Sequence, residues 1–256
     1  MTQQTAAAGF SVGAGDYAAT MAPALRPVAK EVVRRARLGA SERVLDIGTG
    51  TGTAAGLAVG EGRSVTGVDA APGMLGIARR EVPSVTFVEA DFTSLPMEDG
   101  AFNVVLAVHA LLFAEDRVAA LAEWRRVTAR GGRISLSVPG PSTHVPTAVF
   151  AKVYERYGIE WGDDYPTEEQ IGDWAAAAGW ADIASGADPS AAIPLRDEQT
   201  FRAWLRVGSR GRATREWSAE RREQFTRDLM DASPRDGDDG FRLPFGALFL
   251  TAANPS

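Results

Sequence analysis

The stretch at residues 44–52 reads Val-Leu-Asp-Ile-Gly-Thr-Gly-Thr-Gly, and a second apolar run follows it and ends at Asp69. The apolar residues before Gly48 predict a buried strand. The alternating glycines predict a tight turn, because a residue without a Cβ lets the backbone approach a ligand closely. An acid at the end of the second strand is placed to accept hydrogen bonds from a ribose diol. This stretch therefore indicates a site for a nucleoside-bearing cofactor.

The spacing of the glycines distinguishes between cofactor classes. Dinucleotide sites are typified by G-x-G-x-x-G/A, whereas Gly48, Gly50 and Gly52 form G-x-G-x-G and leave Thr53 in the third slot. Asp46 stands two residues before the first glycine, where a carboxylate would repel a pyrophosphate. The same carboxylate suits a ligand with positive charge, such as an amino-acid ammonium or a sulfonium. The spacing argues against a nicotinamide oxidoreductase, which is kept as a rival class.

Residues 46–52 resemble motif I of the class I S-adenosylmethionine-dependent methyltransferases. Further matches follow in the family's order: Asp69 with the ribose-binding acid, Ala90-Asp91-Phe92 with the adenine-edge motif, residues 102–109 with the fourth strand, and residues 130–135 with the turn into the fifth strand. Arg130 stands where proline is usual. The matches cover residues 40–140 and are similar to the ubiquinone/menaquinone-biosynthesis-type small-molecule methyltransferases.

The resemblance implies S-adenosyl-L-methionine as the cofactor and assigns a set of residues to it. These are Tyr17, Asp46, Gly48, Thr49, Gly50, Gly52, Asp69, Ala70, Met74, Ala90, Asp91, Phe92 and Val108.

Several of these residues also have a purely structural interpretation. Asp69 is a candidate N-cap for the helix that follows it. Asp91 is a candidate loop cap, and Phe92 and Met74 are candidate core residues. Tyr17 precedes motif I and is expected either to reach over the cofactor as part of a lid or to pack the first helix.

The chain has two histidines, which are the only side chains that titrate near neutral pH without a perturbing environment. His109 ends the predicted fourth strand, and His144 lies in the loop after the fifth. Both are candidate catalytic bases. The alternatives are a hydrogen-bonded strand-end residue for His109 and a solvent-exposed one for His144. The histidine pair that the family often carries is absent, since Leu112-Phe113 stands there, and no metal pattern surrounds either histidine.

Strands and helices alternate, which predicts an α/β fold with a parallel sheet covered on both faces. The resemblance implies a Rossmann-like doubly wound, seven-stranded, mostly parallel sheet with an antiparallel last strand and a helical cap insertion. We expect a single domain over residues 1–256: an N-terminal helical lid at 1–40, a cofactor-binding core at 41–138, a helical cap with the sixth strand at 139–240, and the last strand at 241–256. Residues 1–15 are expected to be disordered or loosely docked, and the helix at 17–37 to be interrupted at Pro23 and Pro27.

The predicted cap is rich in aromatic residues. Phe150, Tyr154 and Tyr157 share one helix face, which either lines an apolar pocket or docks the cap onto the sheet. A basic stretch over residues 202–215 is interpreted as a solvated face or as a holder for an acidic substrate group.

Composition narrows the function further. The net charge is −6, which does not favour nucleic-acid binding, and the absence of cysteine excludes disulfides and thiolate chemistry. No run is long enough for a membrane span and no leader is evident, so we expect a cytoplasmic protein, either a monomer or a homodimer. The predicted function is methyl transfer to an O, N or C nucleophile of a small apolar or aromatic metabolite. The alternative is a protein of the same fold that binds the cofactor without transferring methyl, such as a cyclase, a decarboxylase-like relative or a regulator.

Overall fold

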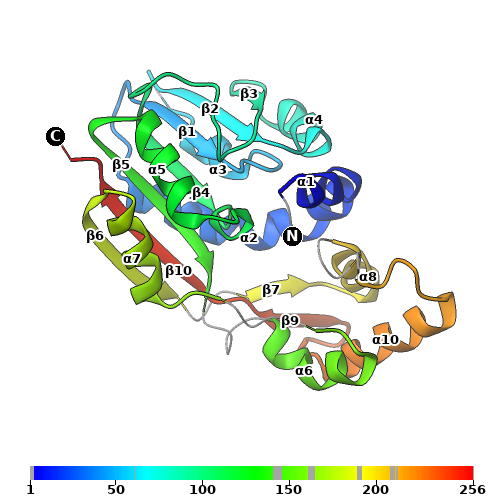
Figure 1. Ribbon diagram of the computed structural model, residues 1–256. Coiled ribbons are helices and arrows are strands. Elements are labelled where there is room, and N and C mark those ends of the chain that lie inside the picture. Colours follow the sequence, from blue (N-terminus) through cyan, green and yellow to red (C-terminus); the bar gives the residue numbers. More distant parts are fainter. Residues whose placement is uncertain are drawn as a thin grey trace.

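The computed structural model describes residues 3–60, 62–140, 146–160, 165–188, 192–207, 211 and 213–255. Its centre is a seven-stranded sheet in the order β3-β2-β1-β4-β5-β10-β6 (Figure 1). The strands are β1 (Arg43–Ile47), β2 (Ser64–Asp69), β3 (Thr86–Glu89), β4 (Phe102–Val108), β5 (Thr128–Pro139), β6 (Ala181–Asp188) and β10 (Ala247–Ala253). Strands β1 to β5 pair in parallel, and β10 runs antiparallel to both β5 and β6. This confirms the predicted fold class.

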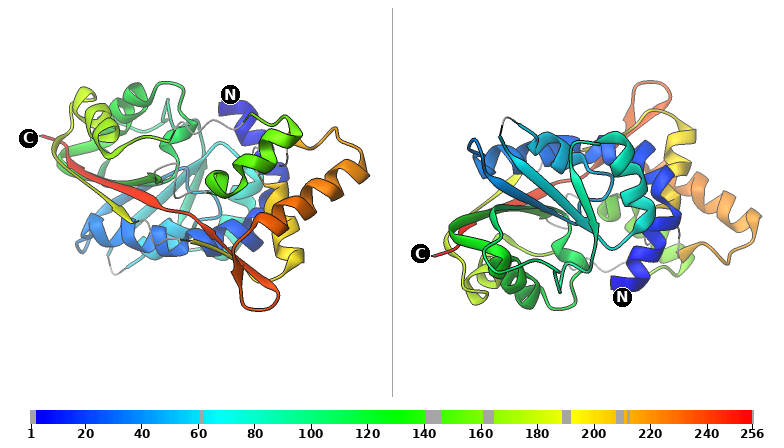
Figure 2. Two further views of the ribbon diagram at one scale, coloured as in Figure 1. Left: turned by 90° about the horizontal axis from the view of Figure 1, so that it is seen from below. Right: turned by 90° about the horizontal axis from the view of Figure 1, so that it is seen from above.

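Helices cover both faces of the sheet, as Figure 2 shows. One face carries α2 (Ala14–Ala36), α3 (Thr53–Ala58) and α4 (Pro72–Glu81), and the other carries α5 (Arg117–Val127) and α7 (Glu168–Ala177). Alternate strand residues supply the two layers, because successive side chains of a strand point to opposite faces. In β4, for example, Val104 packs in the α2 layer and Val105 in the α5 layer.

The N-terminal segment differs from expectation in two ways. Residues 3–12 form a helix, α1 (Gln3–Val12), where loose docking was expected. The predicted interruption of the next helix is also wrong, because α2 continues through Pro23 and Pro27. The two prolines lie four residues apart on the exposed side of α2, while Val28 and Val32 on its other side are buried. Burial of that apolar face offsets the backbone hydrogen bonds that each proline removes.

The cap contains a small sheet besides its helices. Its helices are α6 (Pro146–Tyr157), α8 (Glu198–Arg206) and α10 (Ala219–Ala232), and β7 (Ala192–Leu195), β9 (Gly240–Pro244) and β8 (Arg235–Asp236) form an antiparallel sheet in that order. The predicted helical cap was therefore incomplete, because it lacked this small sheet. Phe241 and Leu243 are buried and Arg242 between them is exposed, which is the period-2 pattern of a strand with one face on a core. The last strand of the large sheet accordingly begins at Ala247 and not at residue 241.

Helix α2 joins the sheet to the cap. Its buried residues lie in one apolar cluster with the cap residues Phe150, Phe201 and Trp204. The cap lies beyond the sheet edge at which β5 ends, and the Gly140 amide there donates a 2.6 Å hydrogen bond to the Gly246 carbonyl. The carboxyl edge of the sheet, where ligands of such folds bind, thus faces the cap.

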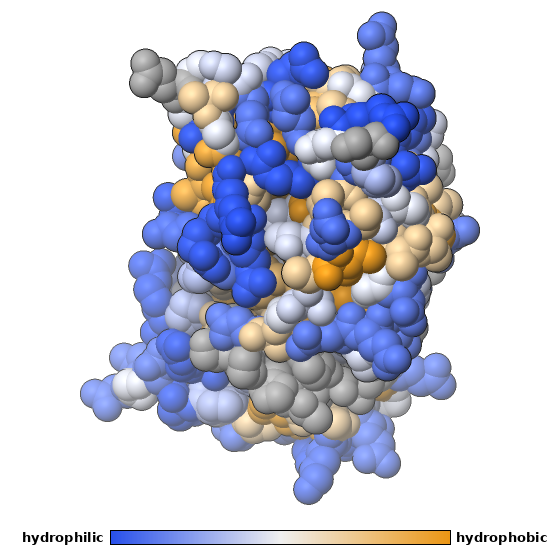
Figure 3. Space-filling model, turned by 90° about the vertical axis from the view of Figure 1, so that its left-hand side faces the viewer, coloured by the Kyte–Doolittle hydropathy of each residue, from blue (hydrophilic) through white to orange (hydrophobic). Residues whose placement is uncertain are grey.

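Seen from the side of β6 and α7, the described surface is mostly hydrophilic, with apolar residues in separate small areas (Figure 3). No helix in the described part of the chain has the length and apolar character that crossing a membrane requires.

Candidate active site

The glycine loop after β1 depends on left-handed backbone angles. Gly48, Gly50 and Gly52 have φ values of +64°, +55° and +84°. A Cβ on Gly48 would lie 2.6 Å from the Ala110 Cβ, and one on Gly52 would lie 3.1 Å from Phe87 Cζ. These two glycines let β1 turn against the ends of neighbouring elements, and side chains there would both clash and strain the backbone.

Asp46 stabilises this loop through hydrogen bonds. Its Oδ2 accepts a 2.6 Å hydrogen bond from Thr49 Oγ1 and a 2.9 Å bond from the Ala55 amide at the start of α3. Burial, opposed by these two hydrogen bonds and aided by the nearby Asp69 carboxylate, raises the pKa of this carboxyl to about 7. A ligand with positive charge would stabilise the ionised form of Asp46, whereas a pyrophosphate would oppose it.

Asp69 closes the loop from the end of β2. Its Oδ2 accepts a 2.8 Å bond from the Gly50 amide, and its Oδ1 accepts a 2.9 Å bond from the Ala71 amide. The N-cap of α4 is Ala71, so the alternative that Asp69 is the N-cap residue is wrong. A carboxylate oxygen has the capacity to accept two hydrogen bonds, so Asp69 can also accept bonds from ribose hydroxyls. The Ala90 amide donates to the Asp69 carbonyl at 3.1 Å, which brings the end of β3 to the same place.

Tyr17 lies over the loop. A Cβ built on Gly50 would have the Tyr17 Cε1 atom, at 4.0 Å, as its nearest neighbour, so space remains between the loop and the ring. Burial raises the pKa of the Tyr17 hydroxyl, and the charges of Asp69 and Asp46 contribute to the rise. The glycine loop, the two acids and this tyrosine therefore form a cradle that suits a nucleoside carrying positive charge.

Helix α1 covers the edge of this cradle. The Phe10 ring lies 6.0 Å from that of Tyr17 and 5.3 Å from that of Phe113, which belongs to the 3-10 turn η1 (Leu111–Phe113) after β4. The Gly73 amide at the start of α4 donates a 2.7 Å bond to Ser11 Oγ. The segment predicted as a lid is thus bound to both sides of the cradle.

Three predicted cofactor residues have structural roles. Met74 is buried beneath α1 and α2, beside Ala14. Phe92 is in the core, with its ring 5.9 Å from that of Trp124. Asp91 is exposed, and its Oδ1 accepts from both the amide and the hydroxyl of Thr93, as a loop cap does. Their contacts with the cofactor stay predictions.

His109 follows β4 directly and has an unusual environment. Its φ is +57°, and its ring is buried. Its Nδ1 lies 3.3 Å from Ser137 Oγ, and its buried Nε2 has no hydrogen-bond partner. Burial lowers the pKa of the imidazole to about 4, so the ring is neutral at pH 7. The next residue, Ala110, is the one that approaches Gly48, so His109 lies beside the glycine loop. His144 lies outside the described residues.

The cap aromatics pack against each other. Phe201 lies 4.7 Å from Phe241 and 5.6 Å from Trp204, measured between ring centroids, and Tyr157 stacks on Trp217 at 5.7 Å. Two arginines of the basic stretch are paired with acids, and Arg215 is exposed. Arg202 binds Glu198 and Glu223, and Arg206 binds Asp16, while Arg210 and Arg212 lie outside the described residues.

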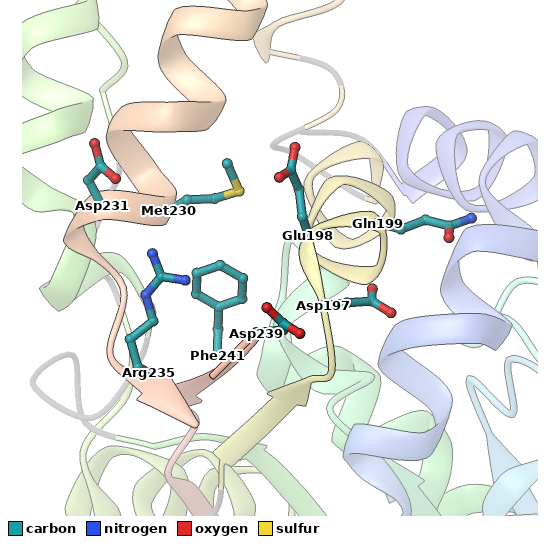
Figure 4. Close-up of a pocket in the computed structure, with 8 residues that line it drawn as sticks. All are labelled: Asp197, Glu198, Gln199, Met230, Asp231, Arg235, Asp239 and Phe241. Atoms are coloured by element: carbon teal, nitrogen blue, oxygen red, sulfur yellow. The ribbon is translucent and has the colours of Figure 1, made fainter. Parts of the chain in front are cut away.

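A cavity of about 450 Å³ opens within the cap (Figure 4). Its lining comes from α8, α10, β8 and β9: Asp197, Glu198, Gln199, Met230, Asp231, Arg235, Asp239 and Phe241. The four acids are exposed, and the guanidinium of Arg235 already covers the Phe241 ring at 4.5 Å. None of the predicted cofactor residues lines it, so this cavity is separate from the cradle.

Sequence reasoning missed three contributors to the site. Ser137 is the partner of His109, and Phe245 packs edge-on against the same ring at 5.3 Å. Arg206 binds Asp16, the residue before Tyr17, through two hydrogen bonds of 2.6 and 2.8 Å. The serines at 135 and 137 inside an otherwise apolar run were a usable signal, because a buried hydroxyl needs a partner. No sequence pattern pointed to Phe245 or Arg206, since the residues that they contact are distant in the sequence.

The fold and the cradle define an α/β protein for a positively charged nucleoside cofactor, and the comparisons identify the family. Residues 45–136 match the family model described as "Methyltransferase domain". The chain is 32% identical over 166 residues to the demethylmenaquinone methyltransferase of Clavibacter sepedonicus, covering 56% of this chain and 67% of that protein. It is 34% identical over 137 residues to the malonyl-[acyl-carrier protein] O-methyltransferase of Serratia marcescens, covering 54% and 53%.

Among solved structures, phosphoethanolamine N-methyltransferase 2 of Haemonchus contortus in complex with S-adenosyl-L-methionine has a TM-score of 0.59 at 19% identity, covering 90% of this chain and 53% of that one. The fold alone is shared at that identity. The chain belongs to the class I S-adenosylmethionine-dependent methyltransferases, as the sequence predicted, and its cofactor is S-adenosylmethionine. The matched regions span between half and two thirds of the two curated relatives.

Proposed function

We propose that this protein transfers a methyl group from S-adenosylmethionine to a nucleophilic O, N or C atom of a small apolar or aromatic metabolite. The observation that carries the proposal is the position of His109. This neutral, buried imidazole is the residue before Ala110, which lies after β4 and contacts the glycine loop at Gly48. A group that can orient an acceptor is thus adjacent to the cofactor cradle.

The residues of the cradle fit the cofactor. The open backbone at Gly50 accommodates its amino-acid portion, the Asp69 carboxylate accepts from the ribose, and Asp46 and Asp69 together favour positive charge. When bound, S-adenosylmethionine supplies a methyl group on a positively charged sulfur and leaves as S-adenosylhomocysteine. Tyr17 and α1 exclude water from this side of the site.

The chain's own contribution to the reaction is mainly alignment. Holding two reactants in the right geometry lowers a barrier by about 7–11 kcal/mol. His109 orients the acceptor through a hydrogen bond and takes its proton where the nucleophile must lose one. The acceptor is proposed to lie between His109 and the cap, where the described ring neighbour Phe245 is apolar.

The identity of the acceptor is a separate matter. The printed names of the two curated relatives give different acceptors, a demethylmenaquinone and a malonyl group on a carrier protein. The apolar ring of Phe245 beside His109 favours an apolar or aromatic metabolite over a strongly charged one. We further propose that the protein acts in the cytoplasm as a monomer or homodimer and binds no nucleic acid, in keeping with its net charge of −6.

The test measures two quantities. Titration calorimetry with S-adenosylmethionine is expected to show binding, and incubation with a panel of apolar hydroxylated, aminated and enolic compounds is expected to release S-adenosylhomocysteine. Binding without release over the panel would favour the alternative, a protein of this fold with a non-methyltransferase activity. The absence of binding would contradict the assignment of the cradle.

A further inference from the structure

A single residue of β5 holds both the backbone and the ring of His109. The His109 amide donates a 2.9 Å bond to the Ser137 carbonyl, and the Ser137 hydroxyl lies 3.3 Å from His109 Nδ1. His109 has a φ of +57°, a region that few residues other than glycine adopt. Such strained backbone persists where the surroundings enforce it, and it is concentrated at functional sites.

The two ring nitrogens of His109 are not equivalent. Ser137 satisfies Nδ1, while Nε2 is buried without a partner. In a neutral imidazole one nitrogen carries hydrogen and the other a lone pair. Buried N–H groups without an acceptor are rarer than buried acceptors without a donor. This favours the tautomer in which Nδ1–H donates to Ser137 Oγ and Nε2 keeps its lone pair.

The ring is also held from the side of the cap. Phe245 stands between β9 and β10 and meets the imidazole edge-on, with 5.3 Å between centroids and 77° between planes. The neighbouring Gly246 carbonyl accepts a bond from the Gly140 amide at the end of β5, so this linker is tied to the sheet. Among the described residues, the Phe245 ring gives His109 an apolar neighbour on that side.

We propose that Ser137 and Phe245 are positioning residues that hold His109 as the neutral Nδ1–H tautomer, with its Nε2 lone pair directed to an uncharged hydroxyl of the acceptor. The inference rests on the proposed function, since it names the acceptor group of that same site. In the proton step, the acceptor O–H bond breaks and its electron pair stays on oxygen. The proton forms a new bond to Nε2, and the imidazolium keeps its second N–H bond to Ser137.

This arrangement selects the acceptor class. An ionised carboxylate carries no hydrogen that it could donate to the Nε2 lone pair, so His109 Nε2 would stay without a partner beside it. A hydroxyl on an apolar or aromatic framework donates to Nε2 and leaves no charge unpaired. The proposed substrates are therefore hydroxylated apolar metabolites that are O-methylated.

The first test needs no acceptor. The chain has only two histidines, so protein labelled with ¹⁵N-histidine gives two sets of ring signals, and the His144→Gln variant assigns them. We expect His109 to show a protonated Nδ1 and an unprotonated Nε2 at pH 7. In Ser137→Ala this pattern is expected to change to a tautomer mixture.

Ser135→Ala is the matched control. Ser135 lies two residues earlier on the same strand and is equally buried, but its hydroxyl donates to the Val32 carbonyl at 2.8 Å. The control should therefore leave the His109 signals unchanged. A protonated Nε2 in the wild type, or equal effects of the two serine variants, would overturn the proposal.

A kinetic test follows with any hydroxylated acceptor from the panel. Ser137→Ala and Phe245→Leu are expected to lower kcat by roughly tenfold, within the range for perturbed acid–base catalysis, with the Kd for S-adenosylmethionine unchanged. Unchanged kcat values in both variants would contradict the positioning role. Failure of the proposed function is distinguishable, because it abolishes cofactor binding or S-adenosylhomocysteine release in the wild type while the ring signals of His109 remain measurable.

Discussion

The cofactor-binding part of the sheet and the cap are held together in different ways. Around the glycine loop, bonds between short polar groups and backbone amides dominate, such as Gly50 to Asp69 and Ala55 to Asp46. In the cap, ring contacts join residues that are distant in the sequence, such as Phe150 and Phe201. The cradle therefore requires particular residues at particular spacings. The cap requires only apolar volume, which many sequences supply.

The largest expected effect comes from the cap core. Phe201→Ala removes a fully buried ring and should lower the free energy of unfolding by about 3–5 kcal/mol. The folded Phe201→Ala variant should keep its affinity for S-adenosylmethionine, because the cap core does not contribute to the cradle. Urea unfolding and calorimetry measure the two quantities. Phe92→Ala, in the core beside the cradle, is the counterpart that should weaken both, and a loss of affinity in Phe201→Ala would break the comparison.

Gly48→Ala probes the backbone requirement of the loop. The left-handed angle costs about 1–2 kcal/mol, and the new methyl group would overlap the Ala110 Cβ, which adds about 1–3 kcal/mol. Gly131→Ala is the matched control, because Gly131 has a φ of +72° but no atom within 4 Å of an added Cβ. Thermal or urea unfolding should show a larger loss for Gly48→Ala. Equal losses would mean that the contact with Ala110 is unimportant.

Asp69→Ala should weaken cofactor binding by about 1.5–3 kcal/mol, roughly ten- to a hundredfold in Kd, since a charged acceptor is lost. Asp69→Asn keeps one acceptor oxygen and should fall between this variant and the wild type. The measurement is calorimetric titration with S-adenosylmethionine. An unchanged Kd in Asp69→Ala would contradict the ribose-binding assignment.

The pH dependence of stability should differ in sign between two buried groups. Asp46, with its pKa raised to about 7, binds more protons in the folded than in the unfolded state, so its contribution to stability is lost as the pH rises from about 4 to 7. His109, with its pKa lowered to about 4, binds fewer protons in the folded than in the unfolded state. Its contribution to stability is therefore lost as the pH falls from about 6.5 to 4. Urea unfolding from pH 4.5 to 7.5 should show that Asp46→Asn and His109→Gln change the slope in opposite directions. Parallel slopes would contradict both assignments.

The smallest expected effect is at the ion pair that joins the two regions. Arg206 and Asp16 are partly exposed, so their coupling energy in a double-mutant cycle with Arg206→Ala and Asp16→Ala should be about 0.2–1 kcal/mol and should fall with salt. The pair between Arg34 and Glu31 lies within one helix and is the control. If the pair positions the lid, only the Arg206 and Asp16 variants raise the Kd for the cofactor.

Several elements followed from local sequence. The strand matched at residues 102–109 is observed at residues 102–108, and Asp116 and Thr167 cap the helices that follow them. Local signals succeed there because turn residues and caps act within a few positions. The continuous α2 and the strand β9 could not be predicted in the same way, since burial against distant elements stabilises them.

The residues of the site likewise divide into those that local sequence predicts and those that distant contacts position. The sequence by itself determined the cofactor class, because the glycine spacing and the acids at 46 and 69 are dictated by contacts between neighbouring parts of one βαβ unit. Only the tertiary structure decided the environment of His109, because its partners Ser137 and Phe245 lie 28 and 136 residues away in the sequence. Long-range packing positions these side chains, and no local pattern encodes it.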